Sequence, residues 1–163
     1  MTQRRYIEKD KVYFVTALIK DRKPVLTVPS NSNLLLATIE YFRYYLDYSV
    51  YGYVIMPEHF HLLVLPSLKY DISKIMNCIK GNFARRYNQI NNCIGDQVWQ
   101  QGFYDKMVRD RQDLMNKIEY MHNNPVKAGL ADKSGDYPFS SYHQYYGKVR
   151  NAVQVMIRPS DLL

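Results

Sequence analysis

Apolar residues follow two different periods along the chain, and their alternation predicts the order of elements. Residues 11–20 (KVYFVTALIK) are rich in β-branched and aromatic side chains, which favours a strand. Residues 34–47 have apolar side chains at the spacing of one helix face: Leu35, Ile39, Phe42 and Leu46. The Pro- and Ser-rich residues 29–32 before this helix predict a loop that ends in helix-capping residues.

The next segment predicts two consecutive strands and a long helix. Residues 51–56 and 59–65 are the strands, separated by Pro57 and Glu58. Pro-Glu is not the favoured chemistry of a two-residue hairpin, so we expect a wider turn or a bulge there. Residues 71–91 predict a helix with Asp71 as its cap, because apolar residues keep the helical period: Ile72, Ile75, Met76, Ile79, Phe83 and Tyr87.

The last elements complete a βαββαβ order followed by one more helix. Residues 103–108 predict a fourth strand, and residues 110–124 a helix that Pro125 stops. Beyond residue 130 the chain is rich in turns, with a short helix expected around residues 141–146. The order predicts an α+β protein with a ferredoxin-like core, an antiparallel sheet with helices on one face. In that topology the first and third strands are neighbours at the centre of the sheet.

Composition bounds the class of protein. With 163 residues, 47% hydrophobic and 23% charged, the chain predicts one folded domain over 1–163, with a core at about 12–143 and a tail at 144–163. The apolar runs are far shorter than the roughly 18 residues of a membrane span, and no secretory signal is visible at the start. Cys78 and Cys93 show no C-x-x-C spacing, so we expect a cytoplasmic protein without a membrane partner.

Charge and aromatic content point to a polyanionic partner. The formal net charge is +7, and the excess is concentrated: residues 1–24 carry seven basic and three acidic groups, and residues 71–92 carry four basic groups against Asp71. Such basic segments are typical of nucleic-acid binding, although a solvated basic surface gives the same composition. Tyrosine is the dominant aromatic residue, with 16 copies against 6 Phe and 1 Trp, and tyrosine stacks on unpaired nucleobases as well as packing in cores.

Two short patterns contain residues that could do chemistry. His59 and His61 flank Phe60 on the third strand, so both imidazoles point to one face, about 7 Å apart at Cα, and can converge on one metal ion. Tyr120 and Asn124 are four residues apart on the last helix and share one face of it. A phenol can act as a nucleophile and an amide oxygen as a metal ligand. The pair matters only if this helix lies beside the strand with the histidines.

Four ordered segments resemble a known family. Residues 52–64, 98–105, 120–130 and 136–142 are similar to the single-tyrosine HUH transposases, most closely the REP-associated tyrosine transposases, and the similarity runs from about Val12 to His143. The resemblance implies a metal-dependent endonuclease and strand transferase that acts on single-stranded DNA near hairpins, through a 5′-phosphotyrosine intermediate. The chain departs from the family pattern at Glu58, where Asn is expected, and at Lys106, where His is frequent.

The resemblance also assigns roles to individual residues. It makes His59 and His61 metal ligands, Asn124 the third ligand, and Tyr120 the nucleophile. The mixed nitrogen and oxygen ligand set suits Mg²⁺ or Mn²⁺. Guidance of the DNA is expected from six basic residues: Lys80, Arg85, Arg86, Arg109, Arg4 and Arg5. Related transposases include homodimers that share active sites as well as monomers, so both assemblies stay open.

Three other functions remain alternatives at this point. A ferredoxin-like module that binds single-stranded nucleic acid without catalysis explains the charge and the tyrosines, but not the grouping of His59, His61, Tyr120 and Asn124. An HUH replication initiator or relaxase would usually place a Lys one turn after the tyrosine, or a second tyrosine, where this chain has Asn123 and Asn124. A metal phosphoesterase without a covalent step would not need Tyr120.

Overall fold

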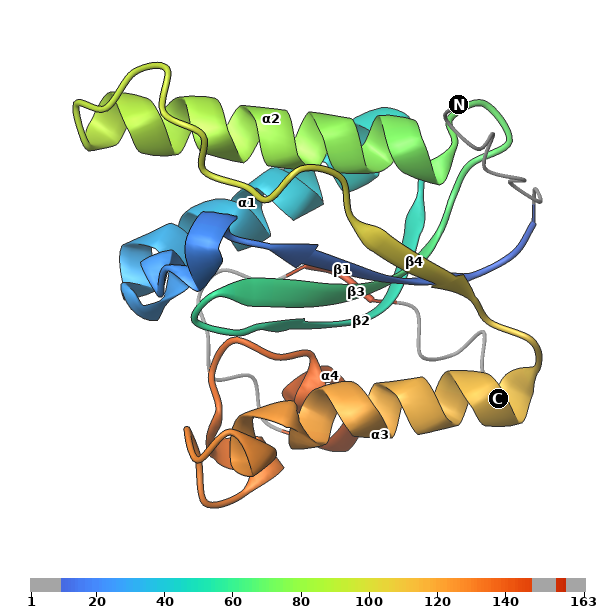
Figure 1. Cartoon of the computed structure of the whole chain (residues 1–163). Helices are drawn as coiled ribbons and strands as arrows, with labels where there is room; N and C mark the ends of the chain where they lie inside the picture. Colours follow the sequence, from blue (N-terminus) through green and yellow to red (C-terminus); the bar gives the residue numbers. More distant parts are fainter. Residues whose placement is uncertain (1–9, 148–154, 158–163) are drawn as a thin grey trace.

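A four-stranded antiparallel sheet forms the centre of the protein (Figure 1). The computed structural model describes residues 10–147 and 155–157. The strands are β1 (Tyr13–Leu18), β2 (Ser49–Ile55), β3 (His59–Leu65) and β4 (Tyr104–Met107), in the order β2-β3-β1-β4. Each neighbouring pair is antiparallel, and β1 and β3 are adjacent at the centre. The expected ferredoxin-like α+β core is therefore confirmed.

Helices cover both faces of this sheet. Helices α1 (Pro29–Leu46) and α2 (Ile72–Ile90) lie on one face, and α3 (Arg111–Lys127) with the short α4 (Tyr142–Tyr146) lies on the other (Figure 1). The two faces have separate hydrophobic clusters: Phe60, Leu62 and Val64 of β3 belong to the α1–α2 side, and Leu63 belongs to the α3 side. Alternation along β3 thus turns His59 and His61 towards α3.

Most predicted elements fall within two residues of the observed ones, and the start of α1 is the first exception. The helix begins at Pro29 and not near residue 34, because proline fits the first helical position, where its missing N–H is not needed. Asn31 Nδ2 donates a hydrogen bond to Val25 O, and Ser32 Oγ donates to Leu26 O. These polar side chains tie the first turn of the helix to the preceding segment and do not form a loop.

The end of α3 is the second exception, because Pro125 does not stop the helix. The helix continues to Lys127, and Pro125 is buried in its last turn. A proline there removes one backbone hydrogen bond near an end where several carbonyl groups already lack helical partners. Gly129 follows the C-cap residue Ala128, has a φ of +71°, and donates its N–H to Val126 O. Glycine adopts this left-handed conformation without strain.

The connection between β2 and β3 is tighter than the wider turn or bulge that the sequence predicts. Met56 N–H donates to His59 O, so only Pro57 and Glu58 join the two strands. Neighbouring segments hold this link in place: Pro57 O accepts from Leu26 N and Glu58 O from Ile19 N. The irregularity in the pairing lies at Val50 and Gly52 instead.

The C-terminal segment covers the outer edge of β2. Ser140 forms a bridge with Val54, and Ile55 N–H donates to Phe139 O. Tyr137 Oη donates to Ile55 O at 2.6 Å, and Tyr145 Oη donates to Tyr51 O. Farther along the chain, Val155 and Ile157 are buried in the α1–α2 cluster. Backbone groups of Tyr51, Tyr53 and Ile55 at this edge of the sheet are therefore paired within the chain.

Candidate active site

The two histidines of β3 point their Nε2 atoms at each other. His59 Nε2 and His61 Nε2 are 3.2 Å apart, and the two rings meet edge to face. The side chain of His59 is 14% exposed, and His61 is 5% exposed. Two nitrogen atoms this close can bind one metal ion in neighbouring coordination positions.

A hydrogen bond at Nδ1 fixes the orientation of each ring. His59 Nδ1 lies 3.0 Å from Glu58 Oε1, and His61 Nδ1 lies 2.7 Å from Thr16 Oγ1, which is directly opposite on β1. Histidines that bind metals usually have such a partner on the nitrogen that does not bind the metal, often a carboxylate. Glu58 is one of the two departures from the family pattern. It contacts His59 and holds the Nε2 atom of that ring towards the site.

Burial keeps both imidazoles neutral near pH 7. It lowers the pKa of His61 to about 3, with a smaller contribution from His59, and it also lowers the pKa of His59 against the opposing effect of Glu58. A neutral imidazole has a free lone pair, and metal binding requires that lone pair. The protonation state and the ring orientation therefore both leave the Nε2 atoms able to bind a metal ion.

Helix α3 brings Tyr120 and Asn124 to the same place. A pocket of about 510 Å³ lies between the sheet and α3, and it is lined by Thr16, Leu18, Arg22, His59, His61, Gln100, Tyr104, Tyr120 and Asn124. The spacing of Tyr120 and Asn124 on one helix face predicts this arrangement once α3 packs against β3. The four residues on which the sequence interpretation depends therefore lie around one pocket.

Aromatic contacts position the ring of Tyr120. Its centroid is 5.6 Å from that of His61 and 6.0 Å from that of Phe14, both in edge-to-face geometry. Tyr120 is 45% exposed, so its ring is held on one side and open on the other. Lys127 Nζ lies 5.6 Å from the ring centroid, which places a positive charge beside the phenol.

The pocket contains an amide side chain as well as the two imidazoles. Within residues 10–147 and 155–157, no group of three His, Cys, Asp or Glu side chains is arranged to hold a metal. The half-buried Asn124 offers an amide oxygen in the same pocket. Two imidazoles and one amide oxygen fit an ion such as Mg²⁺ or Mn²⁺ that keeps other positions for water or substrate.

The depth of the pocket depends on close packing of α3 against β2. Met121 of α3 is fully buried, and a Cβ atom at Gly52 of β2 would lie 2.7 Å from Met121 Cε. Any larger residue at Gly52 would force Met121 to move. Glycine at this position lets the helix that carries Tyr120 approach the sheet closely.

Four of the six basic residues expected to guide DNA lie in the described part of the chain, and none of these four lines the pocket. Arg85 and Arg86 are exposed on α2, on the opposite face of the sheet (Figure 1). Lys80 Nζ donates to Gln100 O at 3.1 Å and to Gly102 O, so it supports the loop that carries Gln100. Arg109 is exposed, and its Nε lies 3.6 Å from Asp113 Oδ2. Arg4 and Arg5 lie outside the described residues.

Sequence reasoning did not single out several residues of the pocket. They are Thr16, Arg22, Gln100 and Tyr104, together with Lys127 beside Tyr120. For Thr16 a signal exists, because it is a polar residue between Val15 and Ala17 in a strand expected next to the histidines. Gln100, Tyr104 and Lys127 fall inside the segments that carry the family resemblance, but nothing in their local pattern places them at the site.

Fold and site together define a DNA-processing enzyme family, and comparison with known proteins agrees. The chain belongs to the family described as "Transposase IS200 like", whose sequence profile matches residues 8–124. The REP-associated tyrosine transposase of Escherichia coli (strain K12) is 29% identical over 142 residues, which cover 86% of this chain and 82% of that protein. A solved structure of the REP-associated tyrosine transposase bound to a REP hairpin superposes with a TM-score of 0.74 at 25% identity, covering 97% of this chain and 99% of the other.

None of the helices that the structure describes is long and apolar enough to cross a membrane.

Proposed function

We propose that this transposase cuts and joins single-stranded DNA near hairpins, in a metal-dependent reaction with Tyr120 as the nucleophile. The observation that carries the proposal is the pocket in which the Nε2 atoms of His59 and His61, 3.2 Å apart, lie with Tyr120 and Asn124. A hairpin substrate is supported by the structural relative, which was solved with a REP hairpin. Such a role would place the protein in the compartment that holds DNA, which in a bacterial cell is the cytoplasm.

The roles of the side chains follow from their positions. His59, His61 and Asn124 would hold Mg²⁺ or Mn²⁺, and the bound ion would supply Lewis acidity towards the phosphate. Tyr120 Oη attacks the phosphorus atom, and the bond from phosphorus to the 3′ oxygen breaks. The products are a 5′-phosphotyrosine and a free 3′ hydroxyl. The phenol loses one proton and the leaving oxygen gains one, so the exchange is balanced.

Nearby cations favour this exchange electrostatically. Lys127 lies beside the Tyr120 ring, and Arg22 lines the pocket on the side of the histidines. Both charges attract the phosphodiester and stabilise the negative charge that develops as the phenol proton leaves. The phosphotyrosine ester conserves the energy of the broken bond, so the strand can be joined to another 3′ hydroxyl without ATP.

A covalent adduct tests the proposal directly. The protein is incubated with single-stranded hairpin DNA from the flanks of its own gene and Mn²⁺, and the products are separated on a denaturing gel. We expect a protein–DNA adduct that EDTA prevents and that maps to Tyr120. Tyr120→Phe should abolish it, whereas Tyr44→Phe, a change at an exposed tyrosine on the opposite side of the sheet, should not. An adduct that survives Tyr120→Phe would contradict the assignment.

A further inference from the structure

A second pocket adjoins the active-site pocket on the same face of the sheet. It has a volume of about 380 Å³ and is lined by Phe14, Thr16, Phe103, Tyr104, Asp105 and Lys106. Thr16 and Tyr104 line both pockets, so the two lie side by side. A molecule bound at the histidines could therefore extend into the second pocket.

Strand register fixes the distance between the two pockets. Thr16 of β1 pairs with His61 of β3 on one side and with Tyr104 of β4 on the other. Residues directly opposite each other point to the same face, so the three side chains form one row across the sheet. Two strand spacings separate His61 from Tyr104, which is about 10 Å at Cα.

The second pocket is lined mainly by aromatic rings, with one cation, Lys106, and one carboxylate, Asp105. Tyr104 is 62% exposed, although it lies in the same cross-strand row as the buried His61. Phe14 forms the wall between the pockets, because its ring stacks on His61 with 5.0 Å between centroids. Lys106 pairs with Phe14 in the next row, so it shares the face of Tyr104, and it is exposed. Flat apolar rings next to an ammonium group match a nucleobase next to a phosphate.

We propose that Tyr104 binds an unpaired nucleobase of the DNA strand whose phosphate lies at the histidines, with Lys106 on the adjoining phosphate. The inference deepens the proposed function and rests on it. It assigns a role to Lys106, where the family pattern often has His. It also gives a physical reason for single-stranded substrate, because a nucleobase in a duplex is stacked and paired and is not free to enter.

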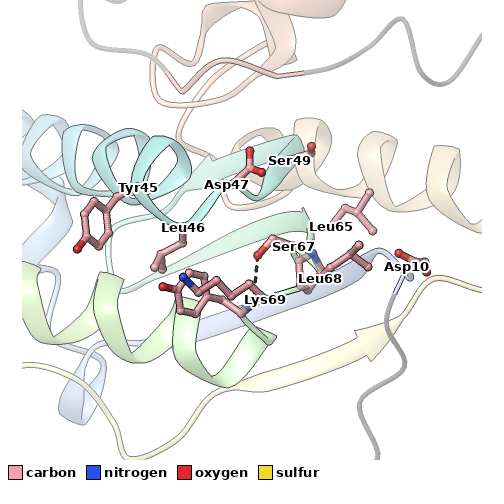
Figure 2. Close-up of a pocket in the computed structure, with 11 residues that line it drawn as sticks. Asp10, Tyr45, Leu46, Asp47, Ser49, Leu65, Ser67, Leu68 and Lys69 are labelled. Carbon is pink, nitrogen blue, oxygen red and sulfur yellow. Dashed lines mark hydrogen bonds between the residues drawn. The ribbon is translucent and has the colours of Figure 1, made fainter.

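Another large pocket of the described structure does not match this ligand. It lies at the end of β3 away from the histidines, with a volume of about 520 Å³, and Figure 2 shows its side chains. Asp10 and Asp47 bring two carboxylates to it, which repel phosphate. Its lysine, Lys69, has its ammonium 5.1 Å from the centroid of the Tyr70 ring. The pocket at Tyr104 has one carboxylate, Asp105, which pairs with Val15 and so alternates to the other face of the sheet from Tyr104 and Lys106. The pocket at Tyr104 is therefore the better candidate for a nucleotide.

The test separates contacts to nucleobases from contacts to phosphates. Binding of short oligothymidylate is compared with binding of an abasic deoxyribose-phosphate strand of equal length, in the Tyr120→Phe protein so that no strand is cut. We expect oligothymidylate to bind more tightly, and Tyr104→Ala to reduce this preference by at least about fivefold, the lower end of what one stacked nucleobase contributes. Tyr104→Phe should keep the preference, because the ring remains. Lys106→Ala should weaken both strands alike.

Matched controls make each outcome decisive. Tyr44→Ala, at a tyrosine that is 86% exposed on α1, should leave the preference unchanged. Tyr104→Ala that keeps the full preference, or that weakens both strands equally, would overturn the proposal. Because binding is measured without cleavage, failure of the proposed function is seen separately: wild-type protein would then form no covalent adduct with hairpin DNA, whatever the binding preference.

Discussion

His122 Nε2 lies 3.0 Å from Ser141 Oγ, and this contact joins the helix of the proposed nucleophile to the C-terminal segment. His122 is 3% exposed, and Ser141 is fully buried. On α3, His122 is two residues from both Tyr120 and Asn124, so it points to the opposite side of the helix. The contact between His122 and Ser141 therefore holds this turn of α3 on the side opposite to Tyr120 and Asn124.

The hydroxyl of Ser141 also connects this anchor to the sheet. Ser141 Oγ accepts from Tyr53 N–H at 3.0 Å and lies 3.3 Å from Tyr53 O. If the hydroxyl donates to Tyr53 O, His122 must donate its Nε2–H to Ser141 Oγ. His122 Nδ1 then carries a lone pair and not a proton, which agrees with its having no partner among the described residues. An unpaired acceptor is tolerated better than an unpaired N–H.

Removal of the Ser141 hydroxyl should destabilise the protein and displace α3. Ser141→Ala leaves Tyr53 N–H and His122 Nε2 without their partner in a buried place, so we expect the free energy of unfolding in urea to fall by about 1–3 kcal/mol. The rate of adduct formation should fall as well, because Tyr120 and Asn124 move with the helix. Ser140→Ala is the neighbouring control and should cost less, since Ser140 Oγ accepts only a long bond of 3.3 Å from Tyr142 N. An equal fall in the free energy of unfolding in both variants would contradict the role assigned to the contact between Ser141 and His122.

Protonation of His122 should make the protein less stable in acid. Burial, with a contribution from His143, lowers the pKa of His122 to about 4, whereas an unfolded histidine titrates near 6.5. The unfolded state therefore binds a proton first as the pH falls, and stability present above about pH 6.5 is lost progressively down to about pH 4. The loss from this residue is on the order of 3 kcal/mol at most. Urea titrations in chelator across this range should show the loss, and His122→Gln should reduce the slope while leaving the part that the buried His59 and His61 contribute.

Loss of the Glu58 carboxylate should weaken metal binding without removing a ligand. Glu58→Ala frees His59 to rotate and to take the other tautomer, so the Mn²⁺ concentration that half-activates cleavage should rise about 10- to 100-fold. His59→Ala and His61→Ala should abolish cleavage at every Mn²⁺ concentration. Glu119→Ala, at an exposed carboxylate next to Tyr120 in sequence, is the control for net charge and should leave the titration unchanged. A shift of the same size in that variant would mean that general electrostatics is responsible.

Adjacent asparagines on α3 should behave differently. Asn124→Ala removes the proposed third ligand, so cleavage should fall and recover in part at high Mn²⁺ concentration. Asn123 lies outside the pocket, and its Oδ1 accepts from Ser134 Oγ at 2.8 Å. Asn123→Ala should therefore lower stability by about 1 kcal/mol and leave the metal dependence of cleavage unchanged. A metal dependence that responds to Asn123 and not to Asn124 would exclude the assigned ligand.

The fold could be predicted largely from local patterns, and the site only in part. The strand His59–Leu65 and the cap at Asp71 follow from short-range chemistry, and the structure has both. The ferredoxin-like order then places the histidines on a central strand. The residues of other strands that contact the histidines could not be predicted. The strand register that places Thr16 between His61 and Tyr104 depends on how three separate strands pair, and no single segment of the sequence determines it. The contact of His122 with Ser141, 19 residues away, likewise depends on the packed structure.

The covered edge of β2 has a consequence for self-association. Strands at an open edge can pair with a second molecule, and such pairing leads to dimers or to aggregates. The segment with Phe139 and Ser141 already occupies the hydrogen-bonding groups of Tyr53 and Ile55 at that edge. Within the described sheet, β4 is the other edge strand, and it has four residues, beginning at Tyr104. A second copy that extended the sheet would have to pair beside the proposed nucleobase pocket, so DNA and a second protein chain would compete for the same short strand.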